Sequence, residues 1–177
     1  MPRLWLVSDP VRLPDPRAAA ARLPAGSGVL ARGAAEEVLR DLSRGPSRLV
    51  VGWDGRAALR HRAGLHLPER EVPGLLPFLA ARRGGAPWAW LTVAVHGRRA
   101  LARARRLRPD AGFVSPAFPT TSHPGAPALG PLRWAALARC LPCPAVALGG
   151  VAPGSAGRLP QCRAAGLAAI GALRSRI

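Results

Sequence analysis

Residues that could bind phosphate or a metal ion follow several short apolar runs of the chain. Arg32 closes one such run, and the fork of N–H donors on a guanidinium group suits a phosphate. Asp54 and Glu71 follow two later runs, and carboxylates are ligands that Mg²⁺ prefers. Gly149 and Gly150 follow another run, and glycine lets backbone N–H groups approach an anion closely. Together these residues indicate a site for Mg²⁺ and a phosphorylated small molecule.

A long polar loop supplies the next candidates. It covers residues 115–130 (SPAFPTTSHPGAPALG), between an apolar run and a helix-like segment. Its hydroxyl groups and His123 could contact phosphate, and we interpret Thr120, Ser122 and His123 as part of a substrate cover. Loops of this length in compact domains are usually binding loops or disordered segments.

Each candidate also has a simpler interpretation. Paired glycines occur in ordinary turns, and Asp54 and Glu71 are equally consistent with solvated surface acids. His96 ends an apolar run and is either a core histidine or a substrate contact. The tryptophans are expected to fill the core, except Trp53, which stands at the end of a run and could stack on a ligand.

Eight short apolar runs alternate with helix-like segments along the whole chain. Continuous apolar strands separated by helices indicate parallel pairing with both sheet faces covered. Eight strand–helix units predict a single (β/α)₈ TIM barrel over residues 1–177, with minimal helices and a truncated final helix. The expected strands are residues 4–8, 28–32, 48–53, 64–67, 88–96, 111–115, 145–149 and 167–171; the expected helices are 16–23, 34–43, 56–62, 71–83, 98–108, 132–141 and 154–165.

This architecture brings the candidates together, because the site of such a barrel lies in the loops after its strands. Glycines after the seventh and eighth strands mark the usual phosphate site of these barrels. The predicted site therefore combines the following residues from the strand ends: Arg32, Trp53, Asp54, Arg56, Glu71, His96, Thr120, Ser122, His123, Gly149, Gly150, Ile170 and Gly171.

The composition narrows the class of protein. The net charge is +17, but all 26 basic residues are arginine, as expected of a G+C-biased coding sequence, so nucleic acid is not the expected partner. No apolar run reaches the ~20 residues that span a bilayer, and the N-terminus is typical of a buried strand, so a cytoplasmic protein without a membrane partner is expected. Cys140 and Cys143 have CxxC spacing but follow a helix and precede a strand, which favours structural cysteines.

Six segments, in register, resemble the thiamine phosphate synthases and the related thiazole tautomerases. LWLVSDP resembles their opening strand, which ends in Thr-Asp, and GLHLPE resembles Gly-Val-His-Leu-Gly-Gln. TVAVHG resembles Val-Ser-Val-His-Ser, and SPAFPTTSHPG resembles Gly-Pro-Val-Phe-Pro-Thr-x-Thr-Lys. VALGGV and GLAAIGAL resemble the two segments that bind the thiazole phosphate.

The resemblance implies a (β/α)₈ barrel that joins an aminopyrimidine diphosphate to a thiazole phosphate and releases pyrophosphate with the help of Mg²⁺. It implies that Arg32 binds the pyrophosphate and that Asp54 and Glu71 fall at or beside the metal-binding acids. By the same resemblance, hydroxyls of the loop (Thr120, Ser122) and His123, where the family has lysine, contact substrate. The thiazole phosphate would be held by Gly149, Gly150, Ile170 and Gly171.

The chain departs from the family at several pyrophosphate ligands. Leu30 and Ala34 replace a glutamine and a lysine on either side of Arg32, Ala94 replaces a serine, and an asparagine beside Asp54 is missing. Pro116 stands where the tautomerase has a histidine, although His96 or His123 could carry a proton instead.

The expected function is thus a thiamine phosphate synthase-like transferase that acts on small phosphorylated substrates. The first alternative is a thiazole tautomerase, or a barrel that binds thiazole phosphate without coupling it. A basic nucleic-acid-binding module is a further alternative, and a homo-oligomer is compatible with either reading.

Overall fold

Eight parallel strands form a closed barrel. They are β1 (Leu4–Val7), β2 (Gly28–Arg32), β3 (Arg48–Gly52), β4 (Gly64–Leu67), β5 (Leu91–Val95), β6 (Ala111–Val114), β7 (Ala145–Leu148) and β8 (Ala164–Ala169). Each strand pairs with the next, and β8 pairs with β1 to close the sheet. The computed structural model describes residues 1–120, 127–159 and 164–173. The predicted (β/α)₈ barrel is confirmed.

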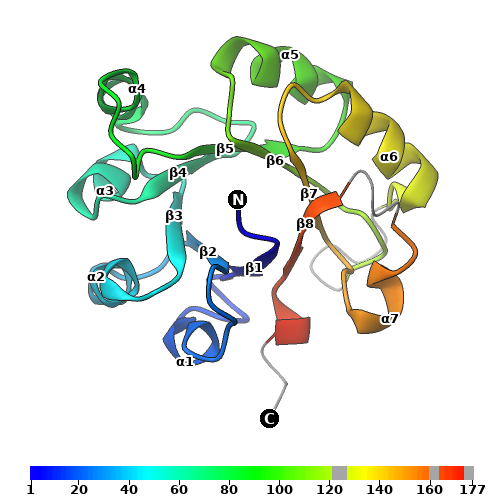
Figure 1. Cartoon of the computed structure of the whole chain (residues 1–177), viewed down its shortest axis with the longest axis horizontal. Helices are drawn as coiled ribbons and strands as arrows, with labels where there is room; N and C mark the ends of the chain where they lie inside the picture. Colours follow the sequence, from blue (N-terminus) through cyan, green and yellow to red (C-terminus); the bar gives the residue numbers. More distant parts are fainter. Residues whose placement is uncertain (121–126, 160–163, 174–177) are drawn as a thin grey trace.

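Helices surround this barrel (Figure 1). They are α1 (Arg17–Ala20), α2 (Glu36–Arg44), α3 (Gly55–Arg60), α4 (Leu75–Arg83), α5 (Arg98–Leu107), α6 (Gly130–Cys140) and α7 (Pro153–Ala156), and the 3₁₀ helix η1 (Gly171–Leu173) follows β8. Within the described residues, no helix is both long and apolar enough to cross a membrane. Several are only one or two turns long, in keeping with the predicted minimal helices.

The inside of the barrel is filled by a separate apolar cluster built around Trp5. Trp5 is fully buried, and its ring meets Phe113 edge-on at a centroid distance of 5.3 Å. A Cβ atom at Gly28 would collide with the Trp5 ring, so the first residue of β2 must be small. Leu30 of β2 and Val50 of β3 belong to the same cluster. This packing fixes the strands whose far ends carry the candidate site.

A second apolar layer joins the outside of the strands to the helices. In α2, Val38, Leu39 and Leu42 are buried, a spacing that puts them on one helical face. Trp134 of α6 is fully buried, and its indole N–H donates to the carbonyl of Val114 at the end of β6. Trp5 and Trp134 fill the core as predicted, whereas Trp88 and Trp90 are only half-buried.

Several predicted boundaries are wrong. Strand β5 begins at Leu91 and not at residue 88, because Trp88 turns away and its ring packs on Phe78 of α4, 6.2 Å between centroids. Helix α4 begins only at Leu75, since Pro73 and Gly74 are poor helix formers. Helix α7 ends at Ala156 and not at residue 165, and β8 begins at Ala164 and not at residue 167.

Candidate functional site

Arg32 is the last residue of β2 and lies where the strands end. Its Nε donates to the carbonyl of Ser8 at 2.8 Å, and one terminal nitrogen donates to Asp9 Oδ2 at 3.1 Å. The backbone N–H of Arg32 also donates to Ser8 Oγ at 2.6 Å. Burial lowers the pKa of the guanidinium group, while the charge of Asp9 opposes this. Arg32 is therefore a cation held in one orientation by the end of β1.

Asp9 connects Arg32 to a second arginine. Its Oδ1 accepts the backbone N–H groups of Val11 and Arg12, and its Oδ2 accepts the Arg12 side chain at 3.2 Å. Burial by itself would raise the pKa of Asp9, but the hydrogen bonds from Arg12 and Val11 outweigh it and lower the pKa below its ordinary value. Asp9 is thus a carboxylate at neutral pH, and it was missing from the predicted site.

Trp53 follows β3, and two arginine side chains lie over its indole ring. The guanidinium carbon of Arg32 lies 5.9 Å from the ring centre, and that of Arg70, in the loop after β4, lies 5.4 Å away. The Trp53 backbone has a φ of 71°, in the left-handed region that bulky residues rarely adopt, and its N–H donates to the carbonyl of His66. This conformation is the kind that persists at functional sites.

Asp54 and Glu71 lie on two segments that touch. Asp54 caps α3, because its Oδ1 accepts the backbone N–H groups of Arg56 at 2.8 Å and Ala57 at 3.0 Å. The next N–H, of Gly55, donates to the carbonyl of Pro73, which follows the exposed Glu71 by two residues. Asp54 is thus a helix cap. Among the described residues, its second carboxylate oxygen has no hydrogen-bond partner.

The donor set for a metal ion is small. Among the residues that the structure describes, no group of three or more His, Cys, Asp or Glu side chains could hold one. Mg²⁺, however, is commonly bound through one or two carboxylates with waters and substrate phosphates. Asp54 and Glu71 fit an ion that arrives with a phosphorylated substrate, and they do not form a complete protein site.

Two histidines lie on the neighbouring strands. His66 of β4 is buried with its Nδ1 2.9 Å from the hydroxyl of Thr92, and burial, together with the charges of Arg32, His96 and Arg103, lowers its pKa to about 3. It is neutral at physiological pH. His96 is exposed after β5, and its Nδ1 lies 3.0 Å from the carbonyl of Ser115. The hydroxyl of Ser115 lies 3.2 Å from the same nitrogen, so Ser115 holds the imidazole ring in place.

The start of the long loop lies directly on the two glycines after β7. The backbone N–H of Phe118 donates to the carbonyl of Gly149 at 3.0 Å. Gly149 and Gly150 have φ values of 89° and 64°, and a Cβ atom at either would collide, with Pro116 or with the carbonyl oxygen of Pro119. The glycines are needed here for the docking of the loop, whatever they also do for an anion.

The other predicted residues follow β6 and β8, and some of them lie outside the described residues. Thr120 follows the docked segment and is half-buried, and Ile170 and Gly171 follow β8. Ser122 and His123 lie outside the described residues. The predicted residues that are described all lie at or after the carboxyl ends of strands. Arg32, Trp53, Asp54, Arg56 and Glu71 are at or after the ends of β2, β3 and β4, and the rest follow β5 to β8.

Two contributors were missed by the sequence prediction. Asp9 had a usable signal, because it directly follows the first apolar run, as Arg32 closes the second. Arg70 had none, because the chain has 26 basic residues and nothing in the sequence distinguishes Arg70 from the others. Only the fold shows that its side chain lies against Trp53.

A family model described as thiamine monophosphate synthase matches residues 30–173. This chain belongs to that family. The match spans β2 to η1 and so contains most of the described site, and the predicted family is confirmed.

Among solved structures, thiamine phosphate pyrophosphorylase from Pyrococcus furiosus is similar, with a TM-score of 0.75 over 98% of this chain and 88% of that chain. Its sequence is 19% identical, so this likeness shows the barrel fold alone. No curated protein sequence matches the chain.

Proposed function

We propose that this member of the thiamine monophosphate synthase family couples an aminopyrimidine diphosphate to a thiazole phosphate and releases pyrophosphate. The observation that carries the proposal is Arg32, a partly buried cation at the rim of the barrel, fixed by Ser8 and Asp9. It lies inside the segment that the family model matches. The neighbouring acids and the glycine-docked loop complete a rim suited to two phosphorylated ligands.

The proposed reaction breaks one bond and forms another. The bond between the methylene carbon of the pyrimidine and the diphosphate oxygen breaks, and its electron pair leaves on the diphosphate. The lone pair of the thiazole nitrogen then forms the new C–N bond. Negative charge grows on the leaving group, so a fixed guanidinium group beside it stabilises the transition state. Because Arg32 is already oriented, little reorganisation is needed.

Mg²⁺ fits this proposal at Asp54 and Glu71, the two acids on the touching segments after β3 and β4. When bound there with the diphosphate, it would neutralise charge on the leaving group. Arg56, beside Asp54 on the same helix end, is available for the same anion.

The thiazole phosphate belongs, in this proposal, to the β6–β8 side of the rim. Thr120 and the backbone around Gly149, Gly150, Ile170 and Gly171 would bind its phosphate, and His96, exposed after β5, would contact the same substrate. The docking of the loop on the glycines supports this placement, because it holds Thr120 beside β7.

A second candidate is a barrel that binds thiazole phosphate without coupling it, as a tautomerase or a binding protein. One observation favours it: Leu30 is fully buried inside the barrel, so the position where the family has a glutamine contributes nothing polar. Ala34 and Ala94 likewise lack polar groups.

Binding measurements separate the two candidates. Isothermal titration calorimetry with Mg²⁺ present should show that the protein binds both inorganic pyrophosphate and thiazole phosphate if it is a synthase. Thiazole phosphate binding without pyrophosphate binding would favour the second candidate. A folded protein that binds neither would overturn both.

A further inference from the structure

We propose that Arg70 and Trp53 form, with Arg32, the anion site for the diphosphate leaving group, and that Arg70 supplies a second cation there. The inference rests on the proposed function for the identity of the ligand.

Trp53 brings the two cations together. The guanidinium carbons of Arg32 and Arg70 lie 5.9 and 5.4 Å from the centre of the same indole ring. They come from different strand ends, β2 and β4, and Trp53 lies between them at the end of β3. Cation–π attraction of about 0.5–1 kcal/mol per pair holds an exposed guanidinium group against an aromatic ring. The indole therefore holds Arg70 in one cluster with Arg32.

The backbone of the Arg70 loop is fixed from outside. Arg103 of α5 donates to the carbonyls of Pro68 and Arg70. The loop also reaches α3, since the carbonyl of Pro73 accepts the N–H of Gly55. Arg70 is thus presented by a braced segment, although its own side chain is exposed.

The charges around Trp53 are not balanced without a ligand. Arg32 is paired with Asp9, which Arg12 shares. Within the described residues, no salt bridge joins Arg70 to a carboxylate, although Glu69 and Glu71 flank it in the sequence. Two cations on one ring repel each other, and a polyvalent anion between them removes that cost. Pyrophosphate carries enough charge and enough acceptor oxygens to engage both forks.

The site takes the place of ligands that the chain lacks. Ala34 and Leu30, on the β2 side, offer no polar group, whereas Arg70 approaches from β4. In this proposal the second cation is Arg70, in the loop after β4, and not a residue beside Arg32.

Calorimetric titration with inorganic pyrophosphate and Mg²⁺ tests the inference in Arg70→Ala, with Arg83→Ala as the matched control. Arg83 is an exposed arginine at the end of α4, so its replacement by alanine removes the same charge at a position away from the rim. We expect Arg70→Ala to weaken pyrophosphate binding on the order of tenfold or more, from the loss of a charge-assisted hydrogen bond. Arg83→Ala should change it less than about twofold. Thiazole phosphate binding should be unchanged in both.

A double-mutant cycle with Trp53→Leu shows whether Trp53 acts by holding Arg70. In the Trp53→Leu background, Arg70→Ala should reduce the affinity for pyrophosphate clearly less than it does in the wild type. Arg70→Lys should recover part of the affinity, since it keeps the charge but not the fork.

The possible outcomes separate the inference from the function it rests on. Wild-type protein that does not bind pyrophosphate would overturn the proposed function and the inference together. Wild-type binding that Arg70→Ala weakens no more than Arg83→Ala does would overturn the inference alone. Thermal unfolding of each variant at an unchanged temperature shows that the comparison is made on folded protein.

Discussion

Asp9 decides how Arg32 is presented, although it need not touch a substrate. It accepts one N–H of Arg32 and three N–H groups from Val11 and Arg12, so the ends of β1 and β2 move as one unit. A carboxylate here also limits the local positive charge. Asp9 is therefore a positioning residue.

Replacing Asp9 with asparagine keeps an acceptor for the backbone N–H groups and removes the charge. We expect Asp9→Asn to lower the free energy of unfolding by about 1 kcal/mol at neutral pH. The folded-state pKa of Asp9 is depressed, so this difference is present above the unfolded pKa of about 3.9 and is lost as the pH falls below it. Urea unfolding of both proteins from pH 7 to pH 2 measures it. A difference that stays constant down to pH 2 would show that the charge is irrelevant.

His66 makes the stability of the protein depend on pH, because its imidazole is neutral in the folded state. Its folded pKa of about 3 lies below the ordinary value of 6.5, so the unfolded chain takes up a proton first as the pH falls. Stability is unaffected above about pH 6.5, and below it falls by up to about 1.4 kcal/mol per pH unit. His66→Gln keeps a partner for Thr92 without titrating. Its urea-unfolding profile should be flatter between pH 6.5 and pH 4 than that of the wild type; parallel profiles would contradict the buried neutral histidine.

At the scale of elements, the β6 loop and the β7 glycines form one unit. The backbone of residues 116–119 lies on Gly149 and Gly150, and Ser155 at the start of α7 donates to the carbonyl of Gly150. A loop that docks this closely cannot be displaced by a side chain without moving Thr120. The half of the rim proposed to bind phosphate thus depends on two residues without side chains.

Gly150→Ala tests this dependence. Alanine at a φ of 64° costs about 1 kcal/mol, and its Cβ atom would also collide with Pro119. We expect a lower unfolding temperature and thiazole phosphate binding weakened tenfold or more, measured by calorimetry, because the loop is displaced. Gly157→Ala is the matched control, since its φ is −64° and nothing lies near the new methyl group. Equal binding by the two variants would show that the loop position does not matter.

The element order was predictable from the sequence, and the boundaries that failed have local causes. The strand positions follow from continuous apolar runs, which a parallel barrel requires. Trp88 looked like part of β5 because aromatic residues favour strands, but it packs on Phe78 instead. The segment from Gly154 to Ala165 was predicted as one helix, whereas α7 ends after Ala156 and Ala164 already pairs with Ala145.

The sequence predicted which residues of the site lie at the ends of strands, but not which of their side chains meet. The fold rule places Arg32, Trp53 and Gly149 on one rim from their order alone. That rule does not predict which side chains meet across loops. Only the structure shows the salt bridge of Arg32 with Asp9 and the contact of Arg70 with Trp53. Asp54 shows the reverse, because a predicted metal ligand also serves as a helix cap.

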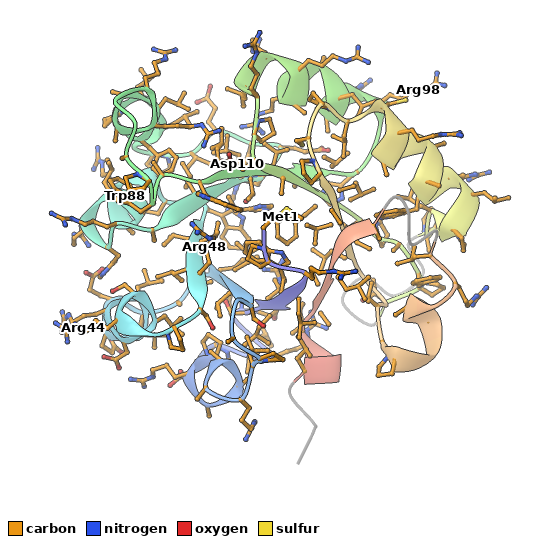
Figure 2. The ribbon with its side chains drawn as sticks, in the orientation of Figure 1. Met1, Arg44, Arg48, Trp88, Arg98 and Asp110 are labelled. Atoms are coloured by element: carbon orange, nitrogen blue, oxygen red, sulfur yellow. The ribbon has the colours of Figure 1, made fainter. Side chains whose placement is uncertain are left out.

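At the scale of the whole molecule, the positive charge is spread over the outer helices. Arg44 of α2 and Arg98 of α5 both extend away from the barrel at its periphery (Figure 2). The rim differs from this surface because its cations are arranged around Asp9 and Trp53. In the proposed reaction, Arg32 and not the net charge of +17 binds the leaving group.

The most direct test is the coupling reaction itself, with aminopyrimidine diphosphate, thiazole phosphate and Mg²⁺, followed by detection of thiamine phosphate. The wild type and the surface control Arg83→Ala should form product at similar rates, and chelation of Mg²⁺ should stop both. Arg32→Ala should lower the rate on the order of a hundredfold or more, as the loss of a charge-stabilising donor does, while it still binds thiazole phosphate. Folded wild-type protein that binds both substrates and yields no thiamine phosphate would contradict the proposed synthase.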